Sequence, residues 1–69
     1  MHTVEWFNTN TRETTVSYEF NNLQEARTHF NDECWNLRTS SIDDQENTKI
    51  LLKEIDENGD DTVLEQFSI

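Results

Sequence analysis

Residues 13–38 read ETTVSYEFNNLQEARTHFNDECWNLR and combine the two clearest structural patterns in the chain. Apolar or β-branched side chains alternate with polar ones across residues 13–20, which is the period of a half-buried strand. Asn22 is a preferred N-cap, and Glu25 three residues later suits both a capping box and the positive end of a helix dipole. We therefore expect a strand followed by a helix over about residues 22–38.

The expected helix carries one apolar stripe, whose members recur at spacings of three and four. These members are Leu23, Ala26, Phe30, Cys34 and Leu37. Arg38 stands at the C-terminal end, where the helix dipole favours a cation. Trp35 falls well away from the stripe. Its indole is expected either to face outward as an anchor for a partner or to fold back over the edge of the sheet.

Two hairpins are expected on either side of this helix. Residues 3–20 form the first, with a turn rich in Asn and Thr between its strands. Residues 41–48 are polar and acidic and predict a connecting loop. Residues 49–69 form the second hairpin around Asn58-Gly59, a dipeptide that favours a tight turn with positive φ at both residues.

The order β-β-α-β-β predicts an α+β fold, with a four-stranded antiparallel sheet and one helix packed on one face. At 69 residues the chain has room for one domain, residues 1–69, with a modest core. The side chains expected under the helix include Val16, Tyr18 and Phe20. The returning strand places Val63, Phe67 and Ile69 in one phase.

The phase of residues 49–55 stays open. Ile50 and Leu52 point one way while Leu51 and Ile55 point the other, so either both faces are partly covered or a bulge shifts the register. The uncovered face is expected to combine carboxylates with Phe7, Leu51 and Leu64. Such a face is either an ordinary surface with scattered apolar residues or a surface for a homodimer or another partner.

Acidic residues dominate the composition, with fifteen Asp and Glu against five Lys and Arg and a net charge of -10. Residues 43–69 hold nine of these acids and only two lysines. Such a field repels nucleic acid and anionic membranes, and it attracts basic surfaces on other proteins. We therefore expect a protein partner, with no direct contact to nucleic acid or membrane.

The remaining composition indicates a folded cytoplasmic protein. Cys34 is the only cysteine, so no intramolecular disulfide forms. No apolar run approaches the roughly 18 residues of a membrane-spanning helix. The aromatic residues, the clear periodicity and the absence of proline argue against a disordered chain.

Catalytic chemistry is not expected. Cys34 lies in the helix stripe and is interpreted as a core thiol rather than a nucleophile. His2 and His29 lack a second His or Cys at ligand spacing, and the single glycine cannot build a phosphate-binding loop. We expect neither an enzyme nor a cofactor nor a structural metal.

Residues 56–61, DENGDD, resemble the start of an EF-hand calcium loop. The oxygen donors would be Asp56, Asn58 and Asp60. However, Asp61 stands where such a loop needs glycine, and Phe67 stands where it needs a bidentate glutamate. We expect a hairpin tip crowded with carboxylates, and weak binding of divalent cations is a secondary hypothesis.

The small size, acidic charge and β-β-α-β-β order resemble those of phage-encoded inhibitors of host defence, such as anti-CRISPR proteins and other nucleic-acid mimics. The resemblance rests on these whole-chain properties and not on a motif. It implies a protein that blocks a positively charged nucleic-acid groove or docking surface on a larger effector. The residues expected to contact the partner are Asp43, Asp44, Glu46, Asp56, Glu57, Asp60, Asp61 and Trp35. The alternative is a homodimeric structural or regulatory module whose charge maintains solubility.

Overall fold

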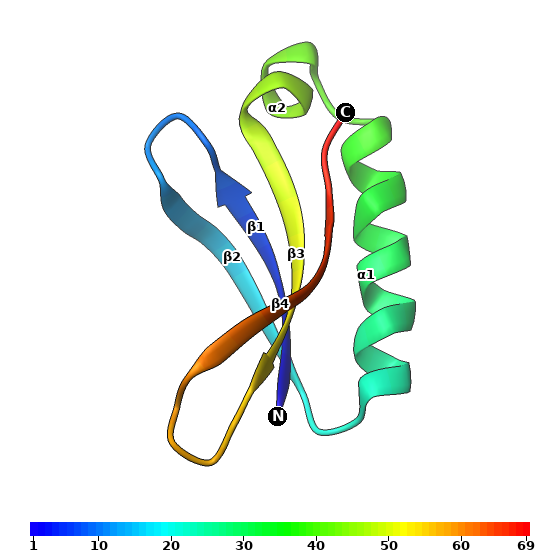
Figure 1. Cartoon of the computed structure of the whole chain (residues 1–69). Helices are drawn as coiled ribbons and strands as arrows, with labels where there is room; N and C mark the ends of the chain where they lie inside the picture. The colour runs from blue at the N-terminus through cyan, green and yellow to red at the C-terminus, as the bar shows by residue number, and fades with distance from the viewer.

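The computed structural model describes residues 1–69 and contains one antiparallel sheet and two helices (Figure 1). The elements in chain order are β1 (His2–Asn8), β2 (Glu13–Phe20), α1 (Leu23–Arg38), α2 (Ile42–Asn47), β3 (Thr48–Ile55) and β4 (Asp61–Phe67). The strands lie in the order β2-β1-β3-β4. Because α1 covers one face of this sheet, the predicted α+β architecture is confirmed.

Helix α1 begins and ends where the sequence predicts. The side-chain oxygen of Asn22 accepts hydrogen bonds from the backbone N–H of Gln24 at 2.7 Å and of Glu25 at 3.3 Å. These bonds satisfy two of the four N–H groups that a helix start leaves without a partner. At the other end, the backbone N–H of Thr39 donates to the carbonyl of Trp35 at 3.2 Å.

The prediction of a connecting loop over residues 41–48 is wrong, because residues 42–47 form α2. The hydroxyl of Ser41 accepts from the backbone N–H of Asp44 at 3.3 Å and caps this short helix. The side-chain amide of Gln45 donates to the carbonyls of Arg38 and Ser40, which fastens α2 to the end of α1. No residue of α2 is buried, so the sequence carries no apolar period that would reveal the helix.

The core lies between α1 and the two central strands. It consists of Val4, Ala26, Phe30, Leu37, Ile50 and Leu52. Four partly buried side chains pack around it, namely Trp6, Phe20, Cys34 and Phe67. The predicted stripe is right in its centre but wrong at Leu23, which is 38% exposed, whereas Glu33 is only 8% exposed.

Strand β2 lies at an edge of the sheet. Val16, Tyr18 and Phe20 pair with Trp6, Val4 and His2 and therefore share the face that α1 covers. The prediction of their face is correct. Yet Val16 and Tyr18 each remain 39% exposed, because α1 packs mainly over the central strands. Only Phe20 of the three packs against the core.

Strand β4 contains a bulge, whereas β3 pairs with β1 without any shift of register. Leu52 pairs with Glu65 and Lys53 pairs with Val63, which leaves Leu64 as the extra residue. Val63 therefore shares the uncovered face with Lys53. The predicted common phase of Val63, Phe67 and Ile69 is wrong, because the bulge separates Val63 from Phe67 across the sheet.

Both faces of β3 are covered to some degree. Ile50 and Leu52 are fully buried in the core, while Leu51 on the opposite face is only 8% exposed. Phe7 and Leu51 share the uncovered face, as the sequence predicts, since Phe7 and Leu51 alternate with core residues along their strands. A second bulge, at Thr15, shifts the pairing between β1 and β2.

The turn between β3 and β4 is longer than predicted. Gly59 has φ of 84°, but Asn58 is not at positive φ, so the expected two-residue turn is wrong. The N–H of Gly59 donates to the carbonyl of Asp56 at 3.1 Å, and the N–H of Asp56 donates to the carbonyl of Asp60 at 3.0 Å. This is the pattern of a loop in which a single glycine adopts the left-handed conformation.

Candidate functional site

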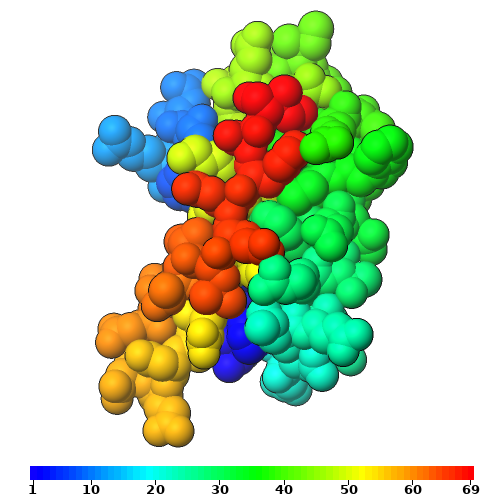
Figure 2. Space-filling model, turned by 45° about the vertical axis from the view of Figure 1, so that its right-hand side comes forward, coloured from blue at the N-terminus to red at the C-terminus, as the bar shows by residue number.

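The predicted partner-binding carboxylates form two groups at opposite ends of β3. The α2 group consists of Asp43, Asp44 and Glu46, and the tip group consists of Asp56, Glu57, Asp60 and Asp61. The hairpin tip projects from one end of the molecule and α2 lies at the other (Figures 1 and 2). An eight-residue strand spans about 23 Å at ~3.3 Å per residue, so the two groups are two separate patches.

Most of this charge has no cation beside it. Only four of the fifteen acidic residues lie within 4 Å of a basic side chain. These four are Glu5, Glu33, Asp61 and Glu65. In the α2 group and the tip group only Asp61 is paired, with 3.3 Å between its Oδ2 and Nζ of Lys53. All seven residues of the two groups are exposed, so their negative potential reaches solvent.

Trp35 faces away from the sheet and is 64% exposed, which favours the outward position over a fold-back onto the sheet edge. It lies one turn before Arg38, whose carbonyl receives the hydrogen bond from Gln45 of α2. Trp35 therefore belongs to the α2 end of the molecule, and the tip group has no exposed aromatic residue of its own.

The tip uses part of its own charge to build the turn. Oδ1 of Asp56 accepts from the N–H of Asn58 at 2.9 Å and from the N–H of Asp60 at 3.0 Å. These bonds fix the Asp56 carboxylate against the backbone. No group of three or more His, Cys, Asp or Glu side chains is arranged to hold a metal ion. Cation binding at the tip stays a hypothesis.

Sequence reasoning missed a buried carboxylate beneath α1. Glu33 is 8% exposed, and its Oε2 accepts a hydrogen bond of 2.6 Å from Nε1 of Trp6. Nε2 of His29 lies 3.1 Å from the other carboxylate oxygen. The His29 ring in turn packs edge-on against Tyr18, with 4.5 Å between the ring centroids. The signal was present, because Glu33 stands three residues after Phe30, on the apolar stripe.

The centre of the uncovered face is charged. Nζ of Lys53 lies 3.1 Å from Oε1 of Glu5 and 3.3 Å from Oδ2 of Asp61. Glu5 also accepts hydrogen bonds of 3.2 Å from the hydroxyls of Thr3 and Thr14. Burial lowers the pKa of Lys53, but the hydrogen bonds to Glu5 and Asp61 raise it more, so the net shift is upward. A dry apolar dimer surface would lack such a network.

Cys34 lies partly buried beside the core. Burial raises the pKa of its thiol to about 11, although the nearby Arg38 guanidinium acts in the opposite direction. The thiol is therefore protonated at neutral pH, and a thiolate nucleophile is not formed there. This agrees with the interpretation of Cys34 as a core thiol.

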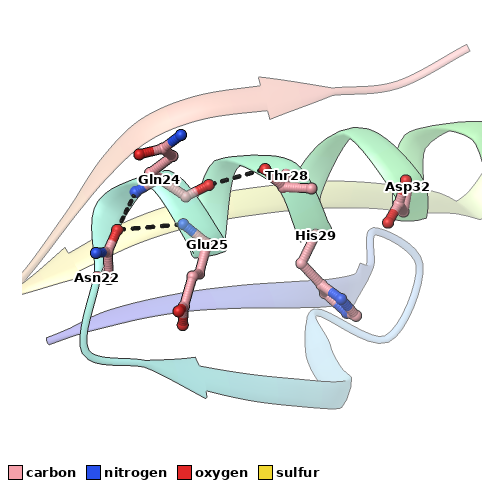
Figure 3. Close-up of a pocket in the computed structure, with 6 residues that line it drawn as sticks. All are labelled: Asn22, Gln24, Glu25, Thr28, His29 and Asp32. Carbon is pink, nitrogen blue, oxygen red and sulfur yellow. Dashed lines mark hydrogen bonds between the residues drawn. The ribbon is translucent and has the colours of Figure 1, made fainter.

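Two open hollows flank the ends of α1. The first, of about 480 Å³, is lined by Asn22, Gln24, Glu25, Thr28, His29 and Asp32 (Figure 3). Glu25 and His29 point from α1 toward β2 in this view. The second, of about 460 Å³, is lined by Arg38, Gln45, Phe67, Ser68 and Ile69. There the Arg38 guanidinium stacks 5.0 Å from the centre of the Phe67 ring, so its charge is partly used within the fold.

Comparison with protein-family models, with curated proteins and with solved structures gave no match. Neither helix is long and apolar enough to cross a membrane. Function is therefore inferred from the charge and geometry of the chain itself, and the two exposed acidic groups are its most distinctive surface.

Proposed function

We propose that this chain is a small acidic protein-binding module that inhibits a larger effector by occupying its basic, nucleic-acid-binding surface. The observation that carries the proposal is the pair of exposed acidic groups at opposite ends of β3. Of their seven carboxylates, only Asp61 has a basic partner. The phage-encoded inhibitors that the chain resembles act on surfaces of this kind.

The spacing of the two groups suits an elongated basic groove. About 23 Å along β3 corresponds to about seven nucleotide steps of a single strand at ~3.4 Å per step. The α2 group is fixed by the Ser41 cap and the tip group by the Asp56 turn, so the charges are held at a defined separation. A rigid array loses little conformational entropy when it binds, which favours affinity.

The net charge also governs how the complex forms. A charge of -10 accelerates encounter with a basic surface, and added salt reduces that acceleration because the Debye length falls. Trp35, beside the α2 group, supplies the apolar contact that electrostatics alone does not provide. In this proposal the protein is not an enzyme, needs no cofactor, and acts in the cytoplasm that holds the effector.

The test begins with immobilised protein and a bacterial lysate at low salt. Retained proteins are identified by mass spectrometry after elution with a short DNA duplex or RNA. A partner held through its nucleic-acid-binding surface is displaced by nucleic acid and by salt. A partner that resists both would contradict the proposal, and a salt-indifferent homodimer that retains no partner would favour the structural or regulatory alternative.

Two variants then locate the contact on the purified partner. One removes the α2 charges (Asp43→Asn/Asp44→Asn/Glu46→Gln), and the other removes three tip charges (Glu57→Gln/Asp60→Asn/Asp61→Asn). Each is expected to weaken binding roughly tenfold, since several charge contacts are lost at once. The matched control Glu13→Gln/Glu19→Gln/Glu25→Gln removes as much charge elsewhere and should bind with near-native affinity. Equal losses in all three variants would mean that only net charge matters.

A further inference from the structure

A second surface lies along the outer edge of β2, on the opposite edge of the sheet from β4. In the order β2-β1-β3-β4, one side of β2 has no neighbouring strand. Seven of its eight residues are exposed. The backbone N–H and C=O groups that point outward from an edge strand are open to pairing with another extended chain.

The exposed side chains of β2 include apolar ones in the middle of the strand and acidic ones near its ends. Val16 and Tyr18 are each 39% exposed on the helix side of the sheet, because α1 covers β2 only in part. Glu13 lies on the same side of the strand, opposite Asn8. The opposite side of the strand presents Ser17 and Glu19, opposite Glu5 and Thr3 of β1.

The neighbouring flank of α1 adds acidic groups beside the same edge. Glu25, His29 and Asp32 line the hollow of about 480 Å³ on this flank (Figure 3). The His29 ring also packs on Tyr18 of β2. None of the residues that line the hollow is Lys or Arg. The ligand chemistry that fits is an extended segment with apolar side chains at its centre and cations at its ends.

We propose that the outer edge of β2 binds an extended basic peptide segment by strand addition. Alternate side chains of the peptide contact Val16 and Tyr18, and flanking lysines or arginines face Glu13, Glu25 and Asp32. A second copy of this chain is a poor occupant, because it would bring another net charge of -10 to the same edge. The site does not depend on the proposed inhibitor function, since it involves neither the α2 group nor the tip group.

The test uses the full chain and the synthetic peptide acetyl-Lys-Thr-Val-Thr-Val-Thr-Lys-amide. Titration followed by amide NMR should shift the signals of residues 13–20 and of the adjoining α1 flank in a saturable way. Two further peptides carry N-methyl groups on alternate backbone amides, one on the odd-numbered residues and the other on the even-numbered residues. Only one of these two methylation patterns should abolish binding, because an added strand forms hydrogen bonds to β2 through only one of its two edges. Equal affinities of the two methylated peptides would overturn the proposal.

Matched variants separate this edge from general electrostatic attraction. Glu13→Gln/Glu25→Gln/Asp32→Asn should weaken peptide binding roughly fivefold, whereas Glu54→Gln/Glu57→Gln/Asp60→Asn should leave it nearly unchanged. Equal weakening by both triples, or shifts centred on the hairpin tip, would refute strand addition at β2. Concentration-dependent shifts of residues 13–20 without peptide would replace the basic segment with a second copy as the occupant.

Discussion

Trp6 and Glu33 form the shortest side-chain hydrogen bond in the molecule, with 2.6 Å between the indole Nε1 and the carboxylate Oε2. The bond joins the central strand β1 to the inner face of α1. It gives the carboxylate of Glu33 a hydrogen-bond partner. Glu33 is only 8% exposed, and its charge would otherwise be costly to bury. Helix and sheet are thus held together by a polar contact at the border of the apolar core.

Replacing Trp6 with Phe should destabilise the fold. The substitution keeps an aromatic ring but removes the donor to Glu33, and a hydrogen bond to a charged group contributes about 1.5–3 kcal/mol. We expect the free energy of unfolding, measured by urea titration, to fall by about that amount. Trp35→Phe is the control, because its indole is exposed and its loss should change stability by less than about 0.5 kcal/mol. Equal effects of the two substitutions would show that the Trp6–Glu33 bond contributes little.

Cys34 should react slowly with thiol reagents in the native protein. Its pKa of about 11 lies two pH units above the ordinary value of 9.0, so the thiolate population at pH 8 is about 100-fold lower than in the unfolded chain. The rate with a disulfide reagent should therefore be about 100-fold lower in buffer than in denaturant. A native rate within threefold of the denatured rate would contradict the buried, protonated thiol.

Lys53 should make stability depend on pH in the alkaline range. Its folded-state pKa is raised, so its charge stabilises the native state fully below the unfolded value, and this stabilisation disappears as pH rises through the folded value. Urea titrations at about pH 9 to 12 in a Cys34→Ala background should show a loss of stability. The additional substitution Lys53→Met should make that loss smaller. An unchanged pH profile would mean that the contacts to Glu5 and Asp61 do not favour the charged form.

Ser41→Ala should loosen α2. The substitution removes the hydroxyl that accepts from the Asp44 N–H, and loss of an N-cap costs about 0.5–2 kcal/mol. Amide hydrogen exchange in residues 42–47 should become faster while the sheet is unaffected. Ser68→Ala is the control, since the Ser68 hydroxyl makes no hydrogen bond in the fold. If the α2 group contacts the partner as proposed, Ser41→Ala should also weaken partner binding.

The helix boundaries were predictable because the signal is local. Asn22 and Glu25 act through bonds and charges within a few residues, which sequence inspection detects directly. Glu33 was predictable in position but not in role, because its helical spacing places it inward whereas its charge suggests solvent. Its burial depends on the indole of Trp6, which is distant in sequence, as well as on the nearby His29.

The bulges and α2 could not be predicted from the same patterns. Leu64 becomes an extra residue because of how β4 aligns with β3, and that alignment depends on contacts across the whole sheet. Helix α2 buries no side chain, so its only local signs were the cap at Ser41 and the acidic residues Asp43 and Asp44 in its first turn. The residues of the two acidic groups are exposed, and their role in partner binding stays a prediction. Their separation follows from the direction of β3, which the composition does not reveal.

The order β2-β1-β3-β4 places β1, the first of these four strands in the sequence, inside the sheet. Val4 lies opposite Leu52, so the central pairing joins residues that are 48 positions apart and forms only after β3 has been synthesised. Before then only the β1–β2 hairpin and α1 are available, and a lone hairpin is marginally stable in water. We therefore expect this non-local pairing to limit the folding rate, and we expect a chain truncated before β3 to be cleaved readily by proteases.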